Sequence, residues 1–215
     1  MIKRNISLSG EKILLIGLFF TPFTSLRFSF LGPGEILIIL AVLIAVVNNN
    51  FSIRIDKRIR VFYRFWYLFL SIALIGVYFN NFFAYVPSGK IDTMIFDLFA
   101  YIFILLTVYA IGHYASLKPD FTETFFQKLF IYWAITYSVL FFISFFTPSI
   151  LGMPLRYYHY FVPLVENVHQ ASMVTMAMCF VMFYLGLKTE GILIKSLFFI
   201  SATLFASMAL TSGST

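Results

Sequence analysis

Charged residues are scarce in this chain. They make up 11% of the 215 residues, whereas hydrophobic residues make up 61%, and the mean hydropathy is +0.93. Ordinary soluble domains carry about 25% charged residues, so this composition excludes that class. We therefore expect an all-α fold, a polytopic bundle of transmembrane helices.

Cysteine and histidine are also too few for two common kinds of site. The one cysteine, Cys179, lies inside an apolar stretch, which excludes a disulfide framework and predicts a packed apolar side chain. His113, His159 and His169 are dispersed without the usual spacing of metal ligands. We expect no metal and no cofactor. No repeat or linker divides the sequence, so residues 1–215 are expected to form a single transmembrane domain.

Apolar stretches of membrane-spanning length recur along the whole sequence. A helix needs roughly 17 to 25 mostly apolar residues to cross the hydrocarbon core. Seven candidates meet or approach this length, although the first contains Pro22 and the second and last are short: 13–30, 34–48, 62–80, 93–112, 129–147, 168–187 and 197–211. About seven spanning helices are therefore predicted.

Lysine and arginine predict the orientation, because cytoplasmic loops retain positive charge. With a cytoplasmic N-terminus, only Arg27, Lys90 and Arg156 lie outside. The other twelve cations then lie inside: Lys3, Arg4, Lys12, Arg54, Lys57, Arg58, Arg60, Arg64, Lys118, Lys128, Lys188 and Lys195. This asymmetry predicts a cytoplasmic N-terminus. No small-residue cleavage site follows the first apolar stretch, so an uncleaved first span is expected.

The basic run from Arg54 to Arg64 has two interpretations. Clustered cations can bind nucleic acid, but they also occur in cytoplasmic loops beside anionic lipid. The second interpretation agrees with the predicted topology, so no nucleic-acid partner is expected.

Polar and aromatic residues gather in the predicted outer loop 148–167, in a cluster that runs from Arg156 to Ala171 at the head of the next span. Pro148, Pro154 and Pro163 resist helix formation, and four aromatic residues follow Arg156: Tyr157, Tyr158, Tyr160 and Phe161. These aromatics suit an interfacial belt better than stacking on sugar rings, and both uses stay open. Polar groups at the head of a spanning helix are costly to bury, which makes this segment the candidate site.

Asn167 is a favourable N-cap for the helix predicted from residue 168. That helix would run inward, so its free backbone N–H groups and positive dipole end would face the outer leaflet and favour an anion. Arg156 could fold over the same place and bind phosphate through two N–H groups. The segment therefore predicts a phosphate or diphosphate site at the outer membrane surface.

Glu166, His169 and Gln170 adjoin this predicted site. The Glu166 carboxylate would repel an anion unless it pairs with Arg156 or serves in proton transfer. His169 could donate a hydrogen bond to phosphate, and Gln170 could bind a sugar hydroxyl. Each residue alone could equally be an interfacial side chain bonded to a neighbouring helix.

Arg156 followed by the run ENVHQA at 166–171 resembles the O-antigen ligase and polysaccharide polymerase family of bacterial membrane glycosyltransferases. Those proteins commonly show an Arg and then Asn-Pro-(His or Asn)-Gln-x-Ala at a helix start. The run LTSGS at 210–214 is similar to their Leu-Thr-x-Ser-Arg motif, and Ser25-Leu26-Arg27 is weakly similar to another. Val168 stands where the family prefers Pro, and aromatic residues replace a Gly after the Arg.

The resemblance implies transfer or polymerisation of undecaprenyl-diphosphate-linked oligosaccharide, without metal, in O-antigen, capsule or exopolysaccharide biosynthesis. The location would be the outer face of the bacterial cytoplasmic (inner) membrane, with a multi-pass protein. The partners would be the lipid-linked oligosaccharide donor and a glycan or lipid-core acceptor. Substrate-binding residues would be Arg156, Asn167, His169, Gln170, Glu166 and Arg27. Glu35, Lys90 and Asp97 also lie toward the predicted outer half.

The catalytic base stays unassigned. The family carries a large outer loop in its second half, so we expect the sequence to be the N-terminal part of a longer protein whose remainder supplies that base. The His-Gln form of the motif leans toward polymerase rather than ligase.

A multispanning transporter or flippase for lipid-linked oligosaccharide is the competing hypothesis. Such a carrier would place ionisable residues near the middle of several spans. The centres of five predicted spans carry no charge, which favours the enzyme. A purely structural membrane subunit would leave the polar segment without a role.

Overall fold

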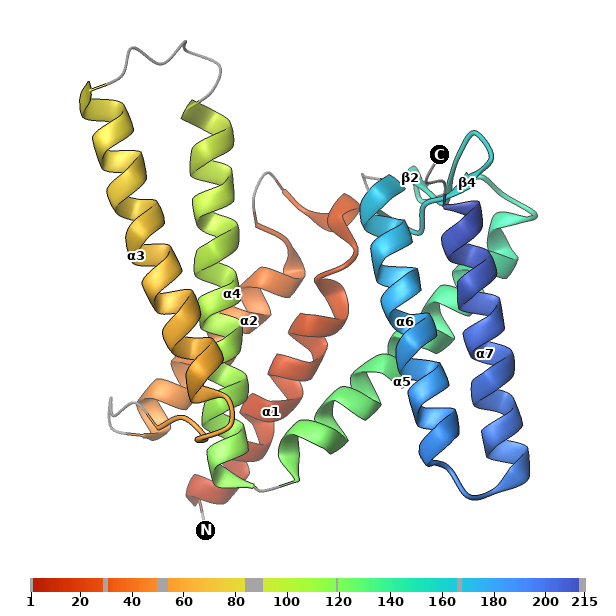
Figure 1. The fold of residues 1–215 in the computed structure, drawn as a ribbon, viewed down its shortest axis with the longest axis horizontal. Coiled ribbons are helices and arrows are strands. Elements are labelled where there is room, and N and C mark those ends of the chain that lie inside the picture. Colours follow the sequence, from red (N-terminus) through yellow and green to blue (C-terminus); the bar gives the residue numbers. More distant parts are fainter. Residues whose placement is uncertain are drawn as a thin grey trace. The chain divides into compact units, whose positions relative to one another are not determined.

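The computed structural model describes residues 2–28, 31–49, 54–83, 91–118, 120–165 and 168–212. Over these residues the chain is mainly helical, as predicted (Figure 1). The helices are α1 (Ile2–Phe20), the 3-10 turn η1 (Thr24–Leu26), α2 (Pro33–Asn48), α3 (Arg60–Phe83), α4 (Ile91–Leu117), α5 (Phe121–Ser144), α6 (Val168–Lys188) and α7 (Ile192–Thr211). Two antiparallel pairs join strands β1 (Ser149–Ile150) with β2 (Met153–Pro154), and β3 (Arg156–Tyr157) with β4 (Tyr160–Phe161).

Within the described residues, five helices are long and apolar enough to cross a membrane. They are the segments Arg60–Tyr78, Leu98–Leu117, Phe121–Ser144, Val168–Lys188 and Ile192–Thr211. This length and composition make the chain a helical membrane protein. The apolar helix α2 has 16 residues. At 1.5 Å per residue it is about 24 Å long, which is less than the roughly 30 Å of the hydrocarbon core.

The bounds predicted for the first span, 13–30, are wrong. α1 begins at Ile2 and ends at Phe20, and the chain then turns through η1. Pro22 has no backbone N–H and restricts the residue before it, so the helix ends ahead of it.

The chain divides into two compact units. The N-terminal unit comprises Met1–Leu18 and Phe28–Phe125, and the C-terminal unit comprises Phe19–Arg27 and Phe126–Thr215. Each unit therefore draws on two separate stretches of sequence.

In the N-terminal unit, α4 packs against α2 and α3. The buried Tyr114 hydroxyl on α4 donates a hydrogen bond to the Ala41 carbonyl on α2 at 3.2 Å. Lys118, just after α4, forms an ion pair with Glu11 on α1 at 2.7 Å. These contacts hold α1 and α2 against α4.

In the C-terminal unit, α6 and α7 form an antiparallel pair, drawn in blue in Figure 1. Trp133 on α5 donates its indole N–H to the Phe19 carbonyl at 2.9 Å. The buried core contains residues from the start of η1, from α5, from the hairpin segment and from α6 and α7. They are Phe23, Tyr137, Leu155, Phe161, Met178, Met182, Phe205 and Met208. The loop after α5 is therefore part of the packed unit.

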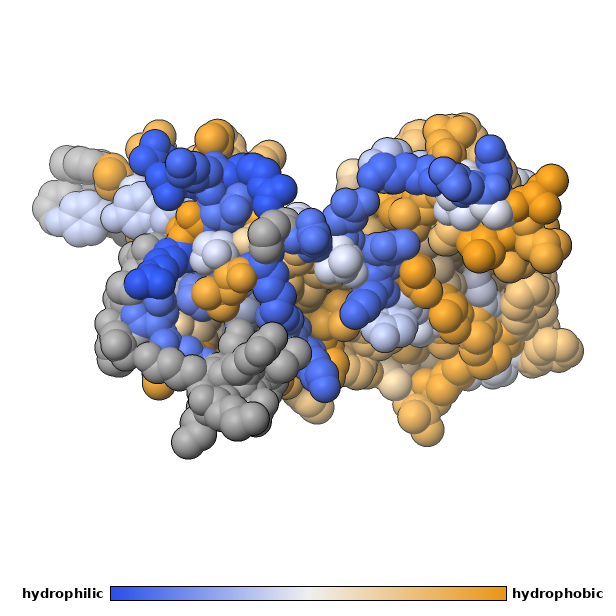
Figure 2. Space-filling model, turned by 90° about the horizontal axis from the view of Figure 1, so that it is seen from below, coloured by the Kyte–Doolittle hydropathy of each residue, from blue (hydrophilic) through white to orange (hydrophobic). Residues whose placement is uncertain are grey.

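Cations of the C-terminal unit lie toward both ends, but unequally. Lys128, Lys188 and Lys195 belong to the end that carries the α6–α7 turn, whereas Arg27 and Arg156 lie toward the hairpins. Figure 2 looks onto the first end and shows hydrophilic residues gathered there, with hydrophobic flanks below them. Such a charged end and apolar flank are what a membrane-spanning bundle requires.

Candidate functional site

The segment between α5 and α6 folds into two small hairpins. Leu151 and Gly152 turn the first with φ of 52° and 79°, and Tyr158 turns the second with φ of 55°. In the first hairpin Ser149 pairs with Pro154, and in the second Arg156 pairs with Phe161. The prediction that the prolines exclude helix here is confirmed, although the strands themselves were not predicted.

Backbone and side-chain hydrogen bonds fix the hairpins to the rest of the C-terminal unit. The Pro148 carbonyl accepts the amides of Leu155 and Arg156 at 2.8 and 3.1 Å. The Ser212 hydroxyl, just after α7, donates to the Phe161 carbonyl at 2.9 Å. Buried Leu155 and Phe161 add apolar contacts to the core. The backbone around Arg156 is therefore positioned from both α5 and α7.

The Arg156 guanidinium lies at the C-terminal end of α5. Its Nε donates a hydrogen bond to the Ser144 hydroxyl at 3.2 Å. Its central carbon lies 4.7 Å from the centre of the Phe145 ring. Ser144 is buried and donates its own proton to the Phe141 carbonyl at 2.7 Å, which leaves an oxygen lone pair for Arg156.

This environment suits a cation. The carbonyl end of α5 carries the negative end of the helix dipole, and the Phe145 face adds a cation–π contact. Within the described part of the chain, Arg156 forms no ion pair with a carboxylate. Ser144 accepts only from Nε, so among the described residues the two terminal NH2 groups of the half-buried guanidinium have no bonded acceptor and can bind an anion.

Helix α6 begins at Val168, which confirms the predicted start, and Figure 1 shows this start at the end of the unit that carries the hairpins. Its first turn leaves His169 exposed and Gln170 half-buried. Ala171 is buried against Val162 and Val165. The helix start and the Arg156 hairpin thus belong to one end of one unit.

Glu166 and Asn167, predicted as a substrate-binding carboxylate and an N-cap, lie outside the described residues.

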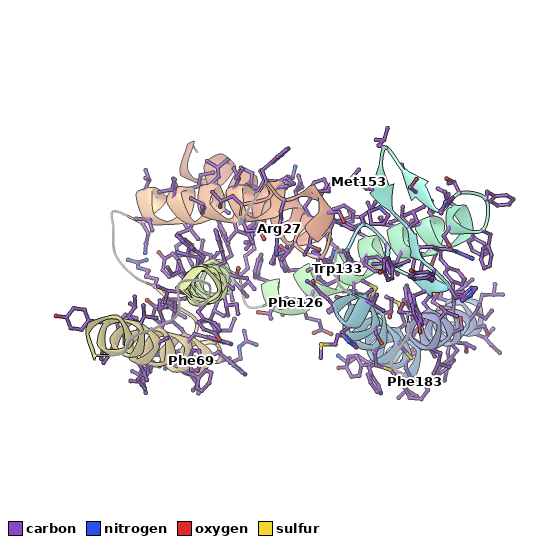
Figure 3. The ribbon with its side chains drawn as sticks, turned by 90° about the horizontal axis from the view of Figure 1, so that it is seen from above. Arg27, Phe69, Phe126, Trp133, Met153 and Phe183 are labelled. Carbon is purple, nitrogen blue, oxygen red and sulfur yellow. The ribbon has the colours of Figure 1, made fainter. Side chains whose placement is uncertain are left out.

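Arg27 belongs to the same unit. The Ser25 amide donates to the Leu164 carbonyl at 3.0 Å, so the turn before Arg27 contacts the segment that leads into α6. Figure 3 looks onto this end and shows Arg27 apart from Met153 on the first hairpin. The structure therefore places Arg27 on the same end as Arg156 but gives no direct contact between them among the described residues.

Glu35 has a structural role. It is buried, and its carboxylate accepts the Gly32 amide at 3.0 Å as part of the cap of α2. It belongs to the N-terminal unit. Lys90, and the side chain of Asp97, lie outside the described residues.

The four aromatics after Arg156 differ in burial, and Tyr160 is intermediate because it packs against the buried cluster of Val162, Val165 and Ala171. Tyr157 and Tyr158 are exposed and meet edge to face at 4.8 Å. Phe161 is buried and packs edge to face on Phe141 at 5.0 Å. Phe161 is therefore a core residue, and the belt interpretation is wrong for it because its side chain packs in the core of the C-terminal unit.

Two residues of the site were not predicted. Ser144 and Phe145 lie at the end of an apolar helix, and only their position at a helix terminus, twelve and eleven residues before Arg156, connects them with the site. Among the described residues no group of three or more His, Cys, Asp or Glu could hold a metal ion.

Comparison with known proteins gave no match to this chain among family models, curated proteins or solved structures.

Proposed function

We propose that this protein transfers or polymerises a diphosphate-linked oligosaccharide at the outer face of the cytoplasmic membrane, as the O-antigen ligase and polymerase proteins that its motif resembles do. The observation that carries this proposal is the Arg156 guanidinium. It is held by Ser144 and Phe145, yet no described carboxylate neutralises it.

The proposed chemistry requires little from the protein beyond charge and alignment. An acceptor hydroxyl attacks the anomeric carbon of the donor sugar, the bond from that carbon to the diphosphate oxygen breaks, and the hydroxyl proton passes to a base. The leaving diphosphate carries the electron pair. A fixed guanidinium stabilises that charge in place of reorganising water.

The described residues around Arg156 would divide the binding between them. Arg156 would bind the diphosphate through its terminal NH2 groups. The free backbone N–H groups in the first turn of α6 would donate to the same anion. His169 and Gln170, in the first turn of α6, would contact the diphosphate or the sugar. Exposed Tyr157 and Tyr158 offer apolar ring faces for the glycan.

The proposed topology has seven membrane crossings and a cytoplasmic N-terminus. It is supported by the sequence, in which this topology places twelve Lys and Arg residues inside and three outside. α1 and α2 would complete the bundle by crossing the membrane beside longer neighbours. Labelling of the hairpin from outside tests this orientation.

Substitution of Arg156 tests the function in the full-length protein expressed in cells that make the polymer. Arg156→Ala should reduce product about 100-fold or more, because one preorganised donor to a developing anion contributes about that much. Arg156→Lys should also fall well below wild type, since an ammonium loses the two-pronged geometry.

Lys128→Ala is the matched control, because Lys128 is an exposed cation on α5 at the opposite end. It should leave product unchanged. Wild-type product from Arg156→Ala, at equal protein level, would remove Arg156 from the mechanism. Movement of the donor across the membrane without new glycosidic bonds would favour the flippase instead.

A further inference from the structure

The segment that leads into α3 carries a dense group of cations. Residues 54–64 contain five cations, Arg54, Lys57, Arg58, Arg60 and Arg64, and one carboxylate, Asp56. All five cations are exposed. The N-terminal unit therefore has a strongly positive surface at the start of a long apolar helix.

The fold holds this segment in a defined place. Ile55 is buried, and the Asp56 amide donates to the Gly112 carbonyl on α4 at 2.9 Å. A Cβ on Gly112 would lie 2.6 Å from Ile55, so glycine permits this close approach. The cations are thus presented by a backbone that is fixed to α4.

The one carboxylate of the segment is already occupied. Asp56 accepts the Arg58 amide at 2.8 Å and the Arg58 Nε at 3.1 Å. These bonds, amide first, hold the pKa of Asp56 below its ordinary value, so it stays ionised and paired at neutral pH. Lys57, Arg60 and Arg64 form no ion pair with a described carboxylate.

An apolar row continues from these cations along α3. Arg60 and Arg64 lie one turn apart on one face, and Leu68 and Ile72 extend the same row. Both apolar side chains are exposed, at 61% and 60%. None of the apolar window of α3 is buried within the protein. Positive charge at one end and an open apolar row beyond it match an amphiphile with an anionic head.

We propose that the first turns of α3 bind an anionic phospholipid. Its phosphate lies among Lys57, Arg60 and Arg64, and an acyl chain lies along Leu68 and Ile72. A nucleic acid could bind the cations through its phosphates, but it has no apolar chain to contact Leu68 and Ile72. A zwitterionic lipid would use the row but gains little from the charge. This lipid site is separate from the proposed diphosphate site, which lies in the other unit.

Tryptophan fluorescence offers a direct test, because the chain has two tryptophans. Trp66 lies within one turn of Arg64 and is partly exposed, whereas Trp133 lies on α5 in the other unit. The Trp133→Phe variant leaves Trp66 as the reporter. It would be reconstituted in vesicles that contain phosphatidylglycerol or phosphatidylcholine with brominated acyl chains, which quench tryptophan on contact.

Brominated phosphatidylglycerol should quench Trp66 with an apparent preference of about fivefold or more over brominated phosphatidylcholine, as expected from at least one basic residue near the lipid surface. The double change Arg60→Gln with Arg64→Gln should lower this preference to about one. The double change to Lys should retain it, because the attraction depends on charge.

The reverse reporter serves as the control. In Trp66→Phe the remaining Trp133 should show the same ratio of quenching with and without the Gln changes. Equal quenching of Trp66 by the two lipids would overturn the proposal. So would a preference that survives in the Gln variant, or displacement of the brominated phosphatidylglycerol by an equimolar oligonucleotide.

Discussion

Removal of the Ser144 hydroxyl should weaken the proposed diphosphate site without unfolding the protein. Ser144→Ala leaves the Arg156 Nε without its acceptor at 3.2 Å and retains the Phe145 ring contact. A hydrogen bond to a charged group contributes about 1.5 to 3 kcal/mol. Arg156 is half-buried, so water can replace part of that bond, and about 1 kcal/mol is the expected loss.

That loss corresponds to roughly fivefold weaker binding of a diphosphate lipid. The assay is displacement of a fluorescent polyprenyl diphosphate from the purified protein in detergent, with thermal unfolding measured in parallel. Ser144→Thr keeps the hydroxyl and should bind the lipid much as wild type does. The melting temperature of the Ala variant should change little, because the one other bond that the Ser144 hydroxyl makes to a described residue is to the Phe141 carbonyl.

Equal binding of the lipid by the Ala and Thr variants would contradict the positioning role of Ser144. That outcome would mean that Ser144 does not position Arg156, and that the hairpin alone holds the guanidinium. An Ala variant with a much lower melting temperature but unchanged affinity would assign Ser144 to stability only.

Two further predictions follow. A Cβ on Gly10 would overlap the Tyr114 hydroxyl, so Gly10→Ala should lower stability by about 1 to 3 kcal/mol, measured by thermal unfolding. Gly76→Ala is the control, because a Cβ at Gly76 meets open space, and it should leave stability unchanged or raise it. An equal loss of stability in the Gly10→Ala and Gly76→Ala variants would contradict this prediction. Tyr157→Cys in a Cys179→Ser background should react with an impermeant maleimide on intact cells. Reaction only after the membrane is opened would reverse the proposed topology.

Helix positions were predictable from the sequence to a useful degree. The apolar stretches near 62–80, 93–112, 129–147, 168–187 and 197–211 correspond to α3 to α7, with shifted ends. Length and apolarity decide such segments locally, because a spanning helix satisfies its own backbone hydrogen bonds. The start of α6 at Val168 was predicted from a different local signal, because Asn167 in the sequence directly before it is a favourable N-cap residue.

The first span and the hairpins show where this local reasoning stops. Hydropathy continues past Phe20, but Pro22 ends the helix, and the chain then contributes Phe23 to the core of the C-terminal unit. The prolines of 148–163 predicted an irregular loop. They did not predict that Arg156 would pair with Phe161 or that Ser212 would bond its carbonyl.

Composition and hydropathy were enough to indicate a helical membrane protein, and the charge pattern singled out Arg156 as one of three cations predicted outside. The way in which this cation is held depends on contacts that the sequence does not reveal. Its partners Ser144 and Phe145 come from the end of another helix, and hydropathy carries no information about which helix end a loop folds back upon. Those contacts depend on packing between segments that are distant along the chain, such as Phe161 against Phe141.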